Sequence, residues 1–84
     1  MVLLAITPSG LADAMRLASE TESAVWCGSD AVSEADYKAR SWPRLSRFIY
    51  PLQEASSDTL AGAVGTIEEH HPGETIWVEA RREA

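Results

Sequence analysis

The feature that most constrains the fold is an apolar run at residues 2–6, which ends at Thr7 and Pro8. A run of Val, Leu and Ile with no polar alternation is typical of a strand buried on both faces. Thr7 is suited to cap a helix, and Pro8 to occupy its first position, where no amide hydrogen is needed. Apolar residues then recur at helical spacing, namely Leu11, Ala14, Met15 and Ala18. The sequence therefore predicts a central strand, a sharp turn and an amphipathic helix.

A second passage of the same kind follows. Residues 23–28 are compatible with a strand that ends at a glycine. A short helix with little apolar area is expected to begin at Ser29 or Ser33 and to continue to about Arg40. Residues 41–46 contain a proline after a tryptophan, which favours a loop over further helix.

The third strand candidate is residues 47–52, and Pro51 either ends it or confines it to a sheet edge. A helix capped by Ser56 or Ser57 comes next. Residues 75–80 alternate apolar residues with Trp77 and Glu79, which is typical of an edge strand solvated on one side.

Two glycines, Gly62 and Gly65, lie inside the third predicted helix, whose apolar stripe is Leu60, Val64 and Ile67. Each interior glycine costs about 1 kcal/mol relative to alanine. We expect close packing of this helix on the sheet to explain why they are tolerated.

Three strand-then-helix passages and a last strand predict one α/β domain over residues 1–84, with a polar tail at residues 81–84. Right-handed crossovers and the double burial of the first strand favour a largely parallel four-stranded sheet of order 2-1-3-4 with three helices. The alternative is a two-layer α+β sandwich with an antiparallel edge strand. The opening, over about 18 residues, resembles the first βα unit of flavodoxin-like domains, a likeness of fold that implies no activity.

Charge is unevenly distributed along the chain. The net charge is −6, which disfavours general binding to nucleic acid backbones. Four of the seven cations lie within residues 38–47, which contain no acid, so the remainder carries three cations against thirteen acids, a net of −10. No segment has the length of a membrane span or the features of a signal peptide, so a cytoplasmic location is expected.

Polar residues follow the predicted strands at the edge where helix N-termini gather, and an anion could bind there. The residues concerned are Thr7, Ser9, Gly10 and Ser29. All of them also serve as caps and turns, which the fold needs without any ligand. No glycine-rich phosphate fingerprint or P-loop lysine accompanies them, so capping is the favoured interpretation.

Cys27 is the only cysteine, and it precedes a predicted helix N-terminus, where a thiolate can be stabilised. The only candidate bases, His70 and His71, are predicted at the opposite sheet edge, so a structural role is favoured. Adjacent histidines point about 100° apart on a helix, so we expect no metal site and no cofactor there.

The basic stretch is the last candidate site: Lys38, Arg40, Trp42, Arg44 and Arg47. A large aromatic among cations suits an anionic partner, whereas Trp42 could instead cover the core. The favoured function is a small, soluble, non-enzymatic module that binds a protein through this stretch or through the exposed side of the Trp77 strand, with a homodimer possible. The alternatives are a phosphate or nucleotide-binding domain and an acidic inhibitor that imitates nucleic acid.

Overall fold

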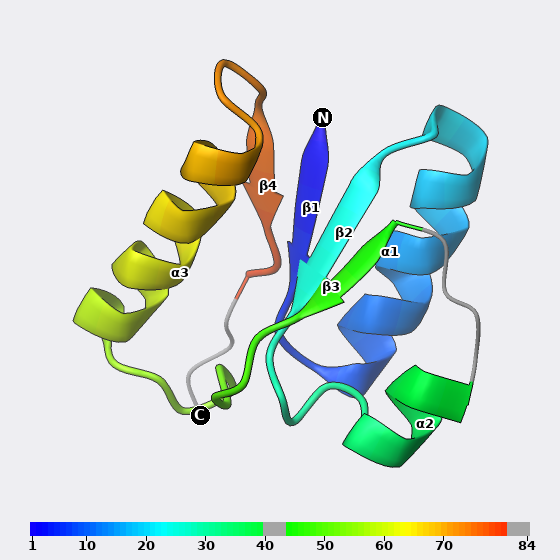
Figure 1. The fold of residues 1–84 in the computed structure, drawn as a ribbon, viewed down its shortest axis with the longest axis vertical. Coiled ribbons are helices and arrows are strands. Elements are labelled where there is room, and N and C mark those ends of the chain that lie inside the picture. Colours follow the sequence, from blue (N-terminus) through cyan, green and yellow to red (C-terminus); the bar gives the residue numbers. More distant parts are fainter. Residues whose placement is uncertain (40–43, 81–84) are drawn as a thin grey trace.

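The computed structural model describes residues 1–39 and 44–80. Its elements alternate along the chain, as Figure 1 shows. The strands are β1 (Val2–Ala5), β2 (Ala24–Cys27), β3 (Leu45–Arg47) and β4 (Ile76–Val78). The helices are α1 (Pro8–Thr21), α2 (Glu34–Ala39) and α3 (Ser57–His70).

The four strands form one parallel sheet in the order β3-β2-β1-β4. The predicted α/β class, the four parallel strands and the three helices are confirmed, and β1 is internal, as its apolar run predicts. The expected order 2-1-3-4 placed the third strand beside the first, whereas in the structure β4 takes that place and β3 lies outside β2. The short α2 passage carries the chain only one strand further, while the long connection at residues 48–56 and α3 carry it back past β2 and β1.

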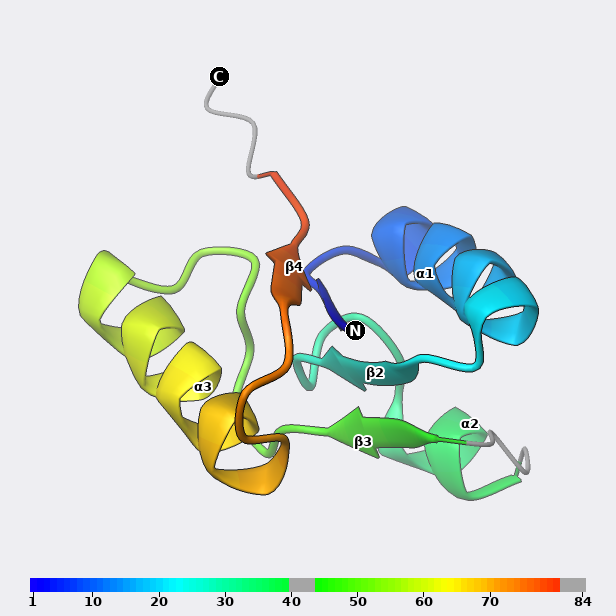
Figure 2. The same cartoon turned by 90° about the horizontal axis from the view of Figure 1, so that it is seen from above.

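Helices cover both faces of the sheet (Figure 2): α1 and α2 lie on one face and α3 on the other. Right-handed crossovers require this arrangement, because the chain moves one way from β1 to β3 and then returns to β4. Strand order therefore reverses between β1 and β4, the position where parallel α/β sheets usually bind ligands at their carboxyl edge.

Two apolar cores result, one on each face of the sheet. Leu3, Val25 and Cys27 pack with Leu11 beneath α1 and α2. On the other face, residues of β1 pack with residues of α3 and of the connection before it, namely Val2, Leu4, Ile6, Phe48, Leu52, Ala63 and Ile67. The first strand is buried on both faces because it contributes alternate side chains to both cores.

The local signals around α1 and α3 are confirmed. Thr7 is the N-cap of α1, and its hydroxyl accepts a hydrogen bond from Gly10 N–H at 3.0 Å. Ser56 caps α3 and accepts from Thr59 N–H at 3.1 Å. Both caps satisfy first-turn amides that have no partner within the helix.

Several expected boundaries differ from the structure. The second helix begins after Ser33, whose hydroxyl accepts from Asp36 N–H, and not after Ser29. The third strand is Leu45–Arg47 and not residues 47–52. Because β2 ends at Cys27, the strand that pairs with it ends at Arg47, and residues 48–52 become a connection whose Phe48 and Leu52 fill the α3 core.

Close packing does not explain the glycines of α3. A β-carbon built on Gly62 or Gly65 would meet nothing within 4 Å. The expectation that both glycines let the helix approach the sheet is therefore wrong, because α3 approaches the sheet through Ala63 and Ile67 instead.

Candidate functional site

The turn between β1 and α1 holds a carboxylate from the far end of the chain. Ile6 N–H and Thr7 N–H donate to Glu79 Oε1 at 2.7 and 2.9 Å, and the Thr7 hydroxyl donates to Glu79 Oε2 at 2.7 Å. Glu79 directly follows β4, and its own amide donates to the Leu4 carbonyl at 2.9 Å. We call this set of contacts the Glu79 clasp.

Gly10 is required by the close approach of that carboxylate. A β-carbon at Gly10 would lie 1.8 Å from Glu79 Oε1, inside any possible contact distance. Burial raises the pKa of Glu79, but hydrogen bonds from Thr7 and Ile6 outweigh it and hold the pKa below its ordinary value. The ionised side chain is thus the group that this helix N-terminus stabilises.

The predicted anion site is only partly assembled. The structure brings together Thr7, Ser9 and Gly10, and the Ser9 hydroxyl lies 3.2 Å from that of Thr7. Ser29 does not join them as a helix cap, because its amide donates to the Tyr50 carbonyl at 2.9 Å in an irregular turn. Glu79 accepts from the two amides before α1 and from the Thr7 hydroxyl, and Gly10 N–H donates to Thr7, so Thr7 and Gly10 have capping roles.

A second carboxylate of the chain also binds backbone amides at this sheet edge. Asp30 accepts from Leu52 N–H and Gln53 N–H, both at 3.2 Å. Gly28 lies against the same turn, and a β-carbon there would lie 2.9 Å from Leu52 N. Asp30 therefore joins the segment that follows β2 to the connection that follows β3.

The structure describes three of the five residues of the basic stretch, and each has its own local setting. Arg47 donates to the Val32 and Ser29 carbonyls, both at 2.9 Å, and so holds the segment before α2. Lys38 pairs with Glu34 at 3.0 Å within α2, and Arg44 has a left-handed backbone with φ of 63°. Two further members, Arg40 and Trp42, lie outside the described residues.

Cys27 is fully buried in the α1 and α2 core, as its structural interpretation predicts. Burial raises the pKa of its thiol to about 11, an effect that the nearby Arg47 partly offsets. The thiolate, which is the nucleophilic form, is therefore disfavoured at neutral pH.

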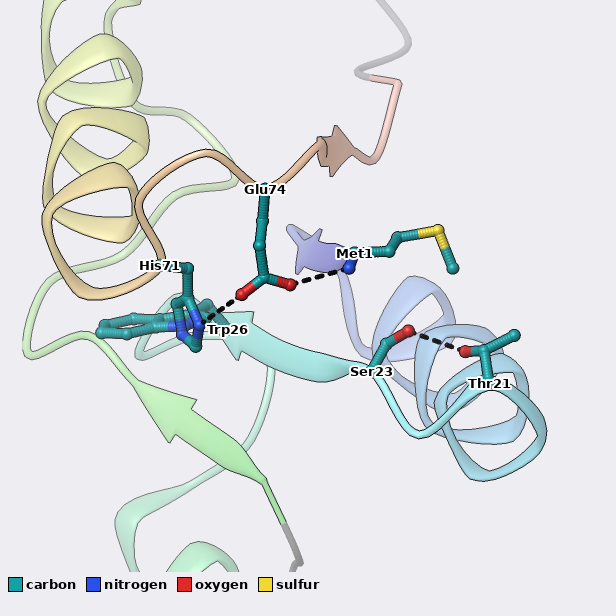
Figure 3. Close-up of polar contacts among 6 residues, drawn as sticks. All are labelled: Met1, Thr21, Ser23, Trp26, His71 and Glu74. Carbon is teal, nitrogen blue, oxygen red and sulfur yellow. Dashed lines mark hydrogen bonds and ion pairs between the residues drawn. The ribbon is translucent and has the colours of Figure 1, made fainter.

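A cluster at the amino edge of the sheet was not predicted from the sequence (Figure 3). Trp26 Nε1–H donates to His71 Nε2 at 3.2 Å, and His71 Nδ1 lies 3.3 Å from Glu74 Oε2. Glu74 Oε1 also pairs with the amino group of Met1 at 2.8 Å. Because Nε2 accepts a hydrogen bond, Nδ1 carries the imidazole proton and donates to Glu74.

This cluster borders a hollow of about 510 Å³, to which Arg44 and Ser23 also contribute. The Ser23 hydroxyl is bonded to that of Thr21 at 2.7 Å. Both ring nitrogens of His71 are engaged, so the geometry serves to fix the α3–β4 turn onto β2. No group of three or more metal-ligating side chains occurs in the described parts of the chain.

The β4 edge of the sheet is open. Val2 N–H donates to the Thr75 carbonyl and Glu79 N–H to the Leu4 carbonyl, both at 2.9 Å, so alternate residues of β4 face β1. The backbone groups of Ile76 and Val78 therefore point away from the sheet. No described residue pairs with that side of β4, which ends the strand order.

An aromatic side chain marks this edge. Trp77 pairs in register with Leu3, so its side chain lies on the α1 face, and it is 59% exposed. The side of α1 that carries Gly10 faces Glu79, which directly follows β4. Leu17 lies two turns further along the same side of α1 and is exposed as well.

Trp77 on the expected solvated side is exposed, but the expected alternation holds only in part. Val78 on the expected buried side is exposed too, and Glu79 on the solvated side is held in the clasp.

The opposite edge of the sheet, β3, has a contact with α2. The hydroxyl of Tyr37 in α2 donates to the outward carbonyl of Leu45 at 3.1 Å. Figure 2 shows α2 beside β3, and the Arg47 side chain reaches back to the segment before that helix. At the β3 edge one outward backbone group is thus bonded to a helix, whereas no such contact joins a helix to the outward groups of Ile76 and Val78 among the described residues.

Comparisons with protein-family models, with curated proteins and with solved structures find no match to this chain. Among the helices of residues 1–39 and 44–80, none combines the length and the apolar character needed to cross a lipid bilayer.

Proposed function

We propose that this protein is a small, non-enzymatic binding module that accepts an extended segment of a partner protein along β4. The observation that supports it is the open edge, where the outward backbone groups of Ile76 and Val78 lie beside exposed Trp77. An extended peptide added to such an edge gains main-chain hydrogen bonds and presents alternate side chains to each face.

Trp77 is the side chain expected to contribute most to affinity. Covering its exposed part, about 150 Å², would contribute roughly 3 to 4 kcal/mol at the usual value per unit of apolar area. Tryptophan is also enriched among the residues that dominate binding energy at interfaces. A strand of three residues offers few hydrogen bonds, so the indole ring is needed for useful affinity.

Three further features favour a binding role over catalysis. Cys27 is buried and its pKa is raised, and the nitrogens of His71 are engaged by Trp26 and Glu74. The Ile6 and Thr7 amides just before α1 are engaged by Glu79. These groups are the ones with the chemistry for nucleophilic, base or phosphate-binding roles. Each of them has a structural partner or lacks access to solvent.

The proposal is tested with a displayed library of linear peptides, selected on the wild-type protein. Binders are then measured against Val78→Pro and Trp77→Ala. Proline at position 78 removes an outward amide and blocks the edge while leaving the bonds between β4 and β1 in place. We expect at least a tenfold loss of affinity in each variant.

Ser46 provides the matched control, because it lies in the other edge strand and is not part of the β4 surface. Ser46→Ala should bind the selected peptides like the wild type. Selected peptides that bind Val78→Pro and Trp77→Ala as well as they bind the wild type would overturn the proposal. So would a library that yields no binder at all. Thermal unfolding of each variant verifies that it is folded, and Trp77→Lys replaces any variant that is not.

A further inference from the structure

A hollow adjoins the start of β4 on the α3 face. It has a volume of about 620 Å³ and is open to solvent. It lies between the C-terminal half of α3 and the turn into β4, and its lining residues are Val64, Glu68, Pro72, Gly73, Glu74 and Ile76. Val64, Pro72 and Ile76 give the hollow an apolar part, and its two charged residues, Glu68 and Glu74, are acidic.

The surroundings of the hollow are acidic as well. Residues 48–80 contain six acids and no lysine or arginine. Glu68 is exposed near the C-terminus of α3, while Glu74 is shared with the Met1 amino group and with His71. Apolar side chains beside an exposed carboxylate suit a long cationic side chain, which buries its methylene stem and keeps its charge in water.

The register of β4 places the hollow within reach of a bound strand. Ile76 lies on the α3 face and lines the hollow, while its backbone groups point outward from the sheet. On a strand paired with β4, the residue opposite Ile76 projects on the same face. Its side chain therefore lies on the face where Ile76 and Glu68 line the hollow.

We propose that the strand accepted by β4 carries a lysine or arginine whose side chain enters this hollow. The inference rests on the proposed function and names the chemistry of the partner, an extended basic segment of a protein. Complementary charge across an interface gives specificity and register more than raw affinity.

The test uses three synthetic peptides with blocked ends, each of alternating valine and threonine. They differ only at the central position, which is lysine, norleucine or glutamate. Affinity is measured by fluorescence anisotropy at low and at physiological ionic strength. We expect the lysine peptide to bind about threefold to tenfold more tightly than the norleucine peptide, and the glutamate peptide to bind least.

Glu68→Gln should reduce the affinity for the lysine peptide to that for the norleucine peptide. Glu20→Gln is the matched control, since Glu20 is an exposed acid on α1 and the substitution changes net charge equally. Equal losses in the two variants would overturn the inference, because net charge alone would explain them. Equal binding of the lysine and norleucine peptides would overturn it too while leaving the proposed function in place. Failure of all three peptides, together with a library that yields no binder, would refute the proposed function itself.

Discussion

Gly10→Ala should have opposite effects on stability depending on whether Glu79 is present. In the wild type the new methyl group expels the Glu79 carboxylate, which then loses its hydrogen bonds to Ile6 and Thr7. Loss of these charge-assisted bonds at a site that water can reach costs about 2 to 3 kcal/mol in total. The higher helix propensity of alanine adds roughly 0.5 to 1 kcal/mol to the free energy of unfolding. The net effect is a destabilisation of about 1 to 2 kcal/mol.

In a Glu79→Ala background the clasp is already absent, so Gly10→Ala should stabilise the protein by about 0.5 to 1 kcal/mol. A double-mutant cycle of these two substitutions, measured by urea unfolding with circular dichroism, should therefore give a coupling energy of about 2 to 3 kcal/mol. If Gly10→Ala has the same effect in both backgrounds, the clasp does not stabilise the fold. Glu79→Gln replaces Glu79→Ala if the latter does not fold.

Three other predictions concern groups that the fold constrains. The pKa of Glu79 is lowered in the folded state, so the ionised side chain stabilises the fold fully above the ordinary carboxyl pKa. This contribution is lost as the pH falls through the lowered pKa. The free energy of unfolding should therefore depend less on acid pH in Glu79→Ala than in the wild type. Gly62→Ala and Gly65→Ala should each raise the free energy of unfolding by up to about 1 kcal/mol, which corresponds to a rise of roughly 4 to 8 °C in the midpoint temperature. A loss of stability in both variants would show that α3 packs more closely than described. Cys27 should react with a maleimide at neutral pH only after denaturation, and modification of the folded protein at the rate of a free thiol would contradict its burial.

Sequence features that act over a few neighbouring residues predicted the first strand and the start of the first helix well. The apolar run of β1, the Thr7 cap and Pro8 define the first strand and the start of α1, because each acts through contacts within a few residues. Alternation along the last strand correctly predicted that Trp77 is solvated, but it wrongly placed Val78 on the buried side, because the α3 core reaches only as far as Ile76. These features depend on local backbone geometry and on the periodicity of burial.

Contacts between distant residues could not be predicted in this way. Glu79 and Thr7 are 72 positions apart, and only the adjacency of β4 and β1 brings them together. The glycine at position 10 was the available sign of a close approach, although it does not indicate what approaches. Phe48 and Leu52 alternate like a strand, yet they belong to a connection, because the extent of β3 is set by where β2 ends.

Amide-resolved NMR of the protein with the lysine peptide tests most directly whether β4 is a binding edge. The amides of Ile76 and Val78 face outward, so on binding they should shift and exchange more slowly with solvent. The amides of Leu45 and Arg47, which face outward on the opposite edge strand, should not change. Shifts and slowed exchange centred on β3, or saturable binding that leaves Ile76 and Val78 unchanged, would contradict the assignment of β4 as the surface that receives a partner strand.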